Sequence, residues 1–504
     1  MRFPRSAGIL LHPTSFPGRY GIGDLGGAAY HFVDFLVEAR QSLWQILPLG
    51  PTGYGDSPYQ CFSAFAGNPL LISPDKLISD GYLPADAVQD VPDFPAEQVD
   101  FGWVIDYKNS LLRRAYQHFQ LYGLGEQREA FDAFCAAESA WLNDYALFMA
   151  LKNHHVHHEG GVWNTWPADI AQREPGAMAY WSGMLADEVR YYKFLQFLFF
   201  NQWLALKAYA NERGIQIIGD IPIFVAFDSA DVWANQGLFY LNDDGSPAVV
   251  AGVPPDYFSE TGQRWGNPLY RWYEMSQNNY AWWTARLKMC FTQADIVRID
   301  HFRGFDAYWE IPAAEPTAVI GKWIKGPGSA FFSAVAENLG ELPLIAEDLG
   351  LITPEVIALR DRFDFPGMKI LQFAFGGERN SQFLPHNFDH NCVVYTGTHD
   401  NETILGWYQN ATEDERDHVR RYMAVDGSNI CWDMIQMAYM SVANTAVATL
   451  QDLMQLDNVA RMNFPGRAAG NWQWRYRNDQ LTDDIATRLR DLTELYGRVP
   501  ETQE

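Results

Sequence analysis

Three short apolar runs in this chain each end in a cluster of acidic residues. They are residues 295–301 (DIVRIDH), 344–348 (LIAED) and 393–400 (VVYTGTHD). Each run has the length of a buried parallel strand. In a (β/α)8 barrel all strands point the same way, and functional groups lie at their C-terminal ends. We therefore expect the three acidic clusters to meet at one end of such a barrel.

The rest of the chain supplies the remaining strands of this barrel. Strand-like runs alternate with helix-like segments, which is the pattern of a parallel α/β fold. We expect strands at residues 8–11, 43–48, 215–220, 295–300, 344–347, 368–375, 392–395 and 447–450. A bare barrel needs about 250 residues, and this chain has 504. The prediction is an α/β protein made of one (β/α)8 (TIM) barrel domain over residues 1–504, with large insertions between strands.

Two insertions are predicted from the uneven spacing of the strands. Residues 73–210, between the second and third strands, contain helical patterns near 107–122, 130–152 and 186–213. Residues 224–278, after the third strand, form an aromatic-rich loop insertion. The chain is 15% aromatic, and aromatic rings in loops can bind the apolar faces of sugar rings. The chain ends soon after a helix expected at 482–496, so no C-terminal β-domain is predicted.

Composition restricts the kinds of binding partner and the cellular compartment that we expect for this protein. The formal charge is −25, which argues against nucleic acid as a partner because that binding needs clustered Lys and Arg. The five cysteines are scattered without a CxxC pair, as in a protein of the reducing cytosol. The N-terminus lacks the apolar core of a signal peptide, and no apolar stretch is long enough to span a membrane. We expect a soluble, cytoplasmic protein that binds neither nucleic acid nor a membrane.

The acidic residues suggest glycosidic bond chemistry. Arg298 and Asp300 share one face of a strand, and Arg298 should keep Asp300 ionised, although a structural ion pair would look the same in sequence. Glu347 follows three apolar residues, a setting that raises a carboxyl pKa and favours a general acid. Cleavage of a glycosidic bond uses two carboxyl groups with opposed protonation states. A third acid, Asp400 beside His399, is compatible with holding a sugar hydroxyl.

Motifs along the chain carry a specific resemblance. They are GILLHPTS (8–15), PTGYGDSPYQ (51–60), GDIPIFV (219–225), GVPPDYFS (252–259), QRWGNP (263–268), RIDHFRGF (298–305), AEDLG (346–350), GTHDN (397–401) and ARMN (460–463). With these motifs the chain resembles the 4-α-glucanotransferases of glycoside hydrolase family 77, the amylomaltase or disproportionating enzymes. The resemblance runs from near residue 8 to about residue 475, in the order of the family, and no motif position departs from the pattern.

The resemblance implies a role for each matching residue. It makes Asp300 the catalytic nucleophile, Glu347 the general acid/base and Asp400 the stabiliser of the transition state. The implied substrate-binding residues are Tyr54, Ser57, Tyr59, Asp220, Trp265, Arg298, His399 and Asn463. Among these, Tyr59 would stack on the sugar at the cleavage point, and Trp265 would belong to a loop over the acceptor side.

The activity implied is transfer of a segment of a (1→4)-α-D-glucan to the 4-hydroxyl of another glucan or of glucose. A retaining double displacement would pass through a covalent glycosyl–Asp300 intermediate. The expected partners are maltooligosaccharides and glucans derived from starch or glycogen. The resemblance implies no cofactor or metal, and the chain contains no GxxxxGK[ST] motif.

Three other readings of the same residues stay open at the level of sequence. The pairs at 300–301, 347–348 and 399–400 are compatible with metal ligands in a metallohydrolase barrel. An inactive glucan-binding protein and an α-amylase-like hydrolase are the other two. The histidines of residues 154–158 also resemble a metal site, but we interpret them as an exposed polar patch in the helical insertion.

Overall fold

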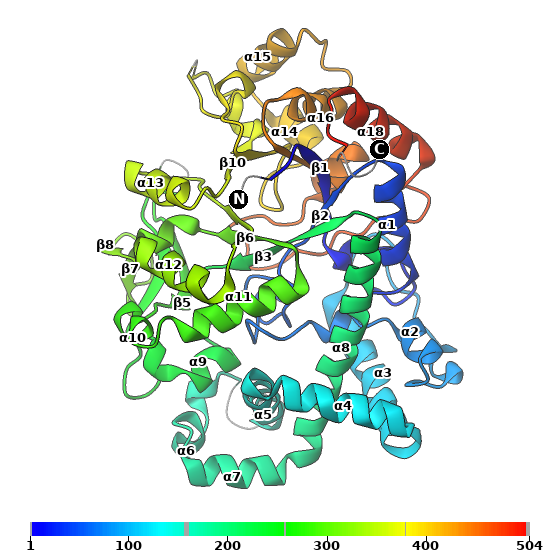
Figure 1. The fold of residues 1–504 in the computed structure, drawn as a ribbon, viewed down its shortest axis with the longest axis vertical. Coiled ribbons are helices and arrows are strands. Elements are labelled where there is room, and N and C mark those ends of the chain that lie inside the picture. The colour runs from blue at the N-terminus through cyan, green and yellow to red at the C-terminus, as the bar shows by residue number, and fades with distance from the viewer. Residues whose placement is uncertain (1–2, 156–160, 257–258, 379, 500–504) are drawn as a thin grey trace.

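The computed structural model describes residues 3–155, 161–256, 259–378 and 380–499. Its centre is a parallel sheet of eight strands (Figure 1), in the order β10-β11-β12-β1-β2-β3-β6-β9. The strands are β1 (Ser6–Leu10), β2 (Leu43–Gln45), β3 (Gln216–Pro222), β6 (Ile296–Asp300), β9 (Leu344–Ala346), β10 (Gly367–Ile370), β11 (Cys392–Tyr395) and β12 (Thr445–Thr449). The N–H of Ala346 in β9 donates to the carbonyl of Pro366, beside β10, at 2.9 Å. The sheet is therefore nearly closed, and the predicted (β/α)8 barrel is confirmed.

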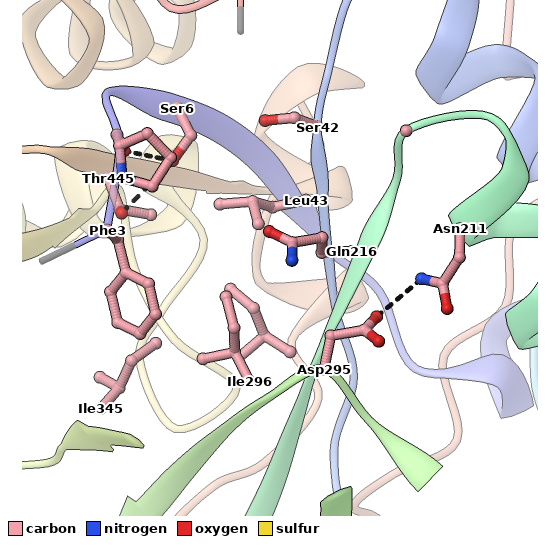
Figure 2. Close-up of a pocket in the computed structure, with 13 residues that line it drawn as sticks. Phe3, Ser6, Ser42, Leu43, Asn211, Gln216, Asp295, Ile296, Ile345 and Thr445 are labelled. Atoms are coloured by element: carbon pink, nitrogen blue, oxygen red, sulfur yellow. Dashed lines mark hydrogen bonds between the residues drawn. The ribbon is translucent and has the colours of Figure 1, made fainter. Parts of the chain in front are cut away.

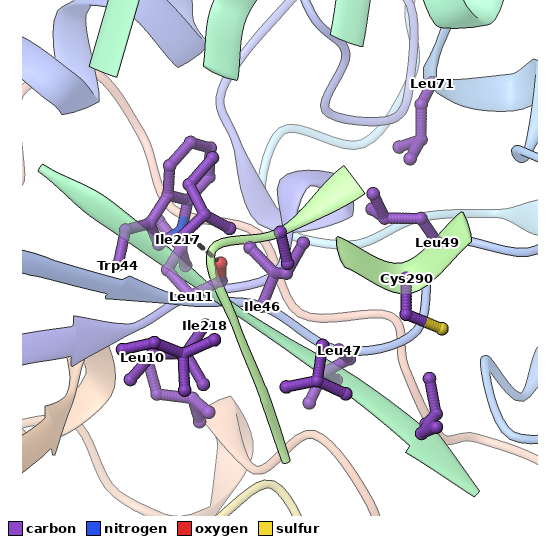
Figure 3. Close-up of a cluster of buried hydrophobic side chains, with 14 of the residues drawn as sticks. Leu10, Leu11, Trp44, Ile46, Leu47, Leu49, Leu71, Ile217, Ile218 and Cys290 are labelled. Carbon is purple, nitrogen blue, oxygen red and sulfur yellow. Dashed lines mark hydrogen bonds between the residues drawn. The ribbon is translucent and has the colours of Figure 1, made fainter. Parts of the chain in front are cut away.

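The barrel strands are buried on both faces because helices cover the outside. All residues of β1, β11 and β12 are buried, as expected where every strand side chain meets either the barrel interior or a helix. Trp44 of β2 is fully buried, and its indole N–H donates to the carbonyl of Leu11 at 2.8 Å. Figure 3 shows this ring among aliphatic side chains of the neighbouring strands. This cluster packs the first three strands against the surrounding helices.

Eighteen α-helices are defined in the described residues. They are α1 (Gly27–Glu38), α2 (Pro74–Ser79), α3 (Phe101–Tyr122), α4 (Gly125–Ala137), α5 (Ser139–His155), α6 (Ala168–Ala171), α7 (Pro175–Met184), α8 (Ala186–Glu212), α9 (Ala230–Ala234), α10 (Trp272–Ser276), α11 (Ala281–Gln293), α12 (Gly328–Leu339), α13 (Pro354–Arg362), α14 (Ile404–Asn410), α15 (Glu413–Met423), α16 (Ile430–Met440), α17 (Leu450–Leu453) and α18 (Asp483–Leu495). After β12 the described residues form helices and loops and no second sheet. None of these helices combines the length and apolar character that crossing a bilayer requires.

Helices α2 to α8 all lie between β2 and β3 in the sequence. Figure 1 shows α3 to α7 gathered at one end of the molecule, with the long α8 returning the chain to the barrel. Phenylalanines join this group: the ring of Phe194 in α8 stacks on Phe119 of α3 at 4.8 Å and meets Phe131 of α4 edge-on at 6.1 Å. Many aromatic residues of this chain therefore serve as helix-packing core.

A second, antiparallel sheet was not predicted from the sequence. It contains β4 (Val249–Val253), β5 (Gln263–Pro268), β7 (Ala307–Pro312) and β8 (Lys322–Lys325), in the order β5-β4-β7-β8. Two of its strands come from residues 224–278 and two follow β6. Glycine and proline hide the alternation of side chains in β4 and β5: a Cβ on Gly252 would lie 2.2 Å from the carbonyl oxygen of Gln263. Strand β5 carries Trp265, one of the residues expected at the site.

Two local predictions are wrong. The sixth strand was expected to reach residue 375, but β10 ends at Ile370 and a 3-10 helix follows over Leu371–Ala374. In this turn the Gln372 side chain donates to the carbonyl of Glu402 at 2.8 Å, which holds the segment away from the sheet. The histidine tract is also not uniformly exposed, because His155 is buried and stacks on Trp166 with ring centres 5.8 Å apart. Residues 156–158 of that tract lie outside the described residues.

Close approach of strands β1 and β2 at Gly8 provides a test of the barrel packing. Gly8 pairs with Leu43, and a Cβ on Gly8 would lie 2.3 Å from the Leu43 carbonyl oxygen. The change Gly8→Ala should therefore lower the free energy of unfolding by about 1–3 kcal/mol, seen as a lower midpoint in thermal unfolding followed by circular dichroism. The control is Gly27→Ala in α1, where a Cβ meets nothing within 4 Å and stability should be unchanged or slightly higher. Equal midpoints for the two variants would contradict this packing.

Candidate active site

The three acidic clusters meet at the C-terminal end of the barrel, as predicted. Asp300 is the last residue of β6, Glu347 follows β9, and Asp400 lies in the loop after β11. A cleft of about 600 Å³ opens at this end. Eight of the predicted site residues line it: Tyr54, Ser57, Tyr59, Trp265, Asp300, His399, Asp400 and Asn463. Asp220, Arg298 and Glu347 reach the same site through the hydrogen bonds described next.

Arg298 connects the two strands at the base of the cleft. In the register of β3 and β6, Arg298 lies directly opposite Asp220. One guanidinium nitrogen donates to both Asp220 carboxylate oxygens, at 2.8 and 2.7 Å, and the other donates to Asp300 Oδ1 at 2.9 Å. Arg298 and Asp220 are buried, so this network acts in a medium of low dielectric constant, where ionic interactions are strong.

Glu347 differs from Asp300 in its hydrogen-bond partners, which are backbone amides and not a guanidinium group. Its Oε2 accepts from the backbone N–H of His301 at 2.7 Å, and its Oε1 accepts from the N–H of Leu349 at 2.8 Å. Burial and the negative charge of Asp300 nevertheless raise the pKa of Glu347 to about 8. Burial also raises the pKa of Asp300, but Arg298 opposes that shift. Of the two carboxyl groups, Glu347 is therefore the one that holds a proton at neutral pH.

Asp400 is held as a carboxylate by its neighbours. Burial alone would raise its pKa, yet His399 and the Asn463 amide bring the Asp400 pKa below its usual range. Asn463 Nδ2 donates to Asp400 Oδ1 at 2.6 Å, and His399 Nε2 lies 3.4 Å from Asp400 Oδ2. Burial works against a charged His399, but Asp400 outweighs it and raises the His399 pKa. Asp400 and His399 thus stabilise each other's charged forms at the wall of the cleft.

Tyr59 joins these two groups of charges. Its hydroxyl donates to Asp220 Oδ2 at 2.7 Å and lies 3.3 Å from His399 Nδ1. Its ring stacks on the His399 ring, with centres 4.9 Å apart. Elsewhere in the cleft, Ser57 Oγ accepts from the Tyr59 N–H at 3.2 Å, while Tyr54 is 79% exposed. Tyr54 therefore offers a ring to solvent, and Ser57 shapes the turn that carries Tyr59.

Three residues of this site were given no catalytic or substrate-binding role from the sequence. Trp472 lines the cleft and packs against Tyr59 and His399, with ring centres 5.9 and 5.8 Å apart. His301 lines the cleft and supplies an amide to Glu347. A nitrogen of the Arg461 guanidinium donates to the carbonyl of Asp400 at 2.6 Å. Trp472 stands in a glycine- and tryptophan-rich segment, GNWQW at 470–474, and that composition was the available signal.

The opposite end of the barrel also contains a cavity, of about 390 Å³ (Figure 2). Ser6, Gln216 and Thr445, at the start of their strands, are among its lining residues. Its carboxylate, Asp295, is already paired: Oδ2 accepts from Asn211 at 2.8 Å and from the Ile217 N–H at 2.7 Å, and Oδ1 lies 3.0 Å from Lys207 Nζ. The charges at this end stabilise the strand starts, whereas those at the C-terminal end face a cleft.

No group of three or more His, Cys, Asp or Glu side chains in the described part of the chain is arranged to hold a metal ion. The carboxyl groups of the cleft are instead contacted by side chains and backbone amides of the protein. Arg298 contacts Asp300, two backbone amides contact Glu347, and Asn463 and His399 contact Asp400.

Comparison with known proteins identifies the family. A family model described as 4-alpha-glucanotransferase matches residues 11–482. The chain belongs to glycoside hydrolase family 77, the 4-α-glucanotransferases. It is 53% identical to the 4-alpha-glucanotransferase of Synechocystis sp., over 98% of both chains. It is 52% identical to that of Thermus thermophilus, over 99% of this chain and 100% of the relative.

A solved amylomaltase extends the similarity to three dimensions. The amylomaltase of Streptococcus agalactiae, in complex with acarbose, superposes with a TM-score of 0.95 at 40% identity. The match covers 98% of this chain and 99% of that one. The family membership and the barrel expected from the sequence motifs are therefore both confirmed.

The ion pairs of Arg298 predict a large effect on stability. In Arg298→Met the buried Asp220 and the half-buried Asp300 lose their counter-charge, so the free energy of unfolding should fall by about 3–5 kcal/mol at neutral pH. The loss should shrink at acidic pH, where Asp300, whose pKa burial raises, takes up a proton. Chemical denaturation at several pH values measures this. Arg477→Met is the control, because Arg477 pairs with Glu97 at the surface and should contribute at most about 1 kcal/mol. Similar losses for the two variants at every pH would contradict this account of Arg298.

Proposed function

We propose that this family 77 transferase works by retaining double displacement at the C-terminal end of its barrel, with Asp300 as nucleophile. The observation that carries the proposal is the opposed environment of two neighbouring carboxyl groups: Arg298 contacts Asp300, whereas burial beside Asp300 keeps Glu347 protonated. Glycosidic bond cleavage with retention needs this combination of one ionised and one protonated carboxyl group.

In the first step Glu347 gives its proton to the leaving glycosidic oxygen. Asp300 attacks the anomeric carbon, and the bond to the leaving glucan breaks as the bond to the Asp300 oxygen forms. In the second step Glu347, now ionised, removes the proton from the 4-hydroxyl of an incoming glucan. That oxygen displaces Asp300, which leaves as a carboxylate, and the starting state of the enzyme is restored.

Asp400 and Asp220 are proposed to act on the sugar at the cleavage point. Asp400 is an acceptor for sugar hydroxyls and stabilises the positive charge that develops on the ring. Its ionised state is supported by His399 and Asn463. Asp220 is rigidly held by Arg298 and Tyr59, which fits a positioning role for a group at the base of the cleft.

The aromatic walls of the cleft are proposed to favour glucan acceptors over water. Tyr54, Tyr59, Trp265 and Trp472 all line the cleft, and aromatic rings can stack on the apolar faces of glucose units. Transfer exceeds hydrolysis when the acceptor occupies these surfaces and water is badly placed. The substrates we propose are maltooligosaccharides and glucans derived from starch or glycogen. All five cysteines are free thiols, which supports a cytoplasmic location.

A product profile with maltotriose as the only substrate tests the transfer reaction and the role of Asp300. We expect a ladder of shorter and longer glucans, including glucose, with little gain in reducing ends. Asp300→Ala should lower the rate by roughly a thousandfold or more, because the covalent step needs this carboxylate. Asp295→Asn, immediately before the start of the same strand, should retain the ladder. A steady rise in reducing ends would indicate a hydrolase, and an active Asp300→Ala variant would exclude Asp300 as nucleophile.

The pH dependence tests the role of Glu347. The proton donor must carry its proton in the free enzyme, so kcat/KM should fall as the pH rises through about 8, the pKa of Glu347. Activity should also fall at acidic pH, where Asp300 becomes protonated. Initial rates of glucose release from maltotriose between pH 4 and 10 measure both limbs. In Glu347→Gln the basic limb should disappear together with most of the activity; an unchanged basic limb in a still active variant would assign it to another group.

A further inference from the structure

His301, the residue after the nucleophile, has an unusual backbone conformation. Its φ is 56° and its ψ is 48°, in the left-handed region. Residues with a Cβ atom rarely adopt this conformation, because the Cβ atom crowds the following carbonyl. Such strain persists only where surrounding contacts hold it, and it often occurs at functional sites. The chain reverses here, between the end of β6 and a 3-10 helix over Phe302–Phe305.

The backbone at His301 acts directly on Glu347. Its N–H donates to Glu347 Oε2 at 2.7 Å, and the carbonyl of Glu347 accepts from the N–H of Phe302 at 3.1 Å. A hydrogen bond from an amide stabilises the charged form of a carboxyl group. The turn at His301 therefore affects both the position of Glu347 and the pKa of its carboxyl group.

The side chain at His301 holds this turn from the other side. The ring meets Trp265 edge-on, with centres 4.8 Å apart and planes at 90°. Gly304 leaves room for it, because a Cβ there would lie 3.3 Å from His301 Cδ2 and 2.8 Å from Ile223 Cδ1. Burial lowers the pKa of His301 to about 3, so the ring is neutral and acts through packing rather than through charge.

Trp265 reaches this point from a distant part of the fold. It belongs to β5, the edge strand of the antiparallel sheet, and its ring lines the cleft. Its indole N–H donates to Gln263 Oε1 at 3.1 Å, so the ring is anchored within its own strand. His301 is thus in contact with the cleft wall through its ring and with the proton donor through its backbone.

We propose that His301 is a positioning residue: its ring, packed against Trp265, holds the left-handed turn that keeps a backbone N–H on Glu347. The cleft-lining strand β5 is thereby coupled to the proton donor. This inference rests on the proposed role of Glu347 as general acid/base.

Other charged groups also act on Glu347 and must stay constant in a test. Asp300 and Arg298 of β6 affect its pKa directly, and the N–H of Leu349 contacts its second oxygen. Asp220 of β3 and the pair His399 and Asp400 act on Asp300. None of these is changed by substitutions at His301 or Trp265.

The test compares His301→Ala with His301→Gly in the full-length enzyme, by the pH profile of kcat/KM with maltotriose. Alanine keeps the strain of the left-handed turn but lacks the ring that holds it, whereas glycine adopts the turn without strain. In His301→Ala the amide contact is lost, so the basic limb should move up by about one pH unit. In His301→Gly the limb should stay close to that of the native enzyme.

A double-variant cycle tests the contribution of Trp265. Trp265→Ala should move the basic limb in the same direction as His301→Ala, and it should cause no further shift when added to His301→Gly. An undiminished shift in the His301→Gly background would overturn the coupling. Equal losses in His301→Ala and His301→Gly, with an unmoved basic limb and a higher KM, would overturn it too, because the ring would then contact the substrate.

Controls separate this inference from folding defects and from the proposed function itself. Gln455→Ala changes another non-glycine residue with a left-handed φ, 54°, in an exposed position, and should leave the profile unchanged. Thermal unfolding identifies variants that fail to fold; His301→Asn, which tolerates the left-handed region, then takes the place of His301→Gly. Loss of the basic limb in Glu347→Gln supports the role of Glu347 whatever the His301 variants show, so the two proposals fail separately.

Discussion

The organisation of this site depends on one buried guanidinium group. Arg298 lies between Asp220 on the neighbouring strand and Asp300 on its own strand, and it contacts both carboxylates at less than 3 Å. Removing ionic groups from water is unfavourable, and a buried ion pair often adds little net stability. Its value here is positional, because the planar guanidinium fixes two carboxylates at once. The parallel register that sets Asp220 opposite Arg298 makes this arrangement a direct product of the barrel.

The other charges of the cleft follow from that arrangement. With Asp300 ionised beside Arg298, a second charge on the buried Glu347 is unfavourable, and its pKa rises to about 8. The pKa of Asp400 does not rise in the same way, because His399 and Asn463 compensate for its burial. Of the three carboxyl groups within one cleft, Glu347 is therefore protonated while Asp300 and Asp400 are ionised, and the partner that each strand or loop supplies determines the difference. The amylomaltase fold provides those partners from β3, β6, β9, β11 and the segment after β12.

The sequence predicted the parts of the structure in which burial is continuous. The runs before Asp300, Glu347 and Asp400 are apolar because both faces of a barrel strand are covered, and their polar ends indicated the site. The antiparallel sheet was missed because β4 and β5 contain Gly252, Gly266 and Pro268 instead of alternating apolar residues. Pairing of β4 with β7 also joins segments that are distant in the sequence. Periodicity cannot indicate such long-range contacts.

Within the site, motif matching located the residues, whereas their contacts required the fold. Asn463 was a weak candidate in the sequence, yet it donates directly to Asp400. Trp472 and His301 were not placed in the catalytic or substrate-binding set, because the first depends on a loop that folds back onto Tyr59. The position of His301 depends on a left-handed backbone turn, which the presence of a histidine in the sequence does not predict.

The central claim is that Arg298 keeps Asp300 ionised while Glu347 holds the proton. Neutron diffraction from crystals grown in heavy water near neutral pH observes these protons directly. We expect a deuterium on the Glu347 carboxyl group and none on Asp300 or Asp400. A deuterium on Asp300 with an ionised Glu347 would contradict it, because the nucleophile and the proton donor would then be exchanged.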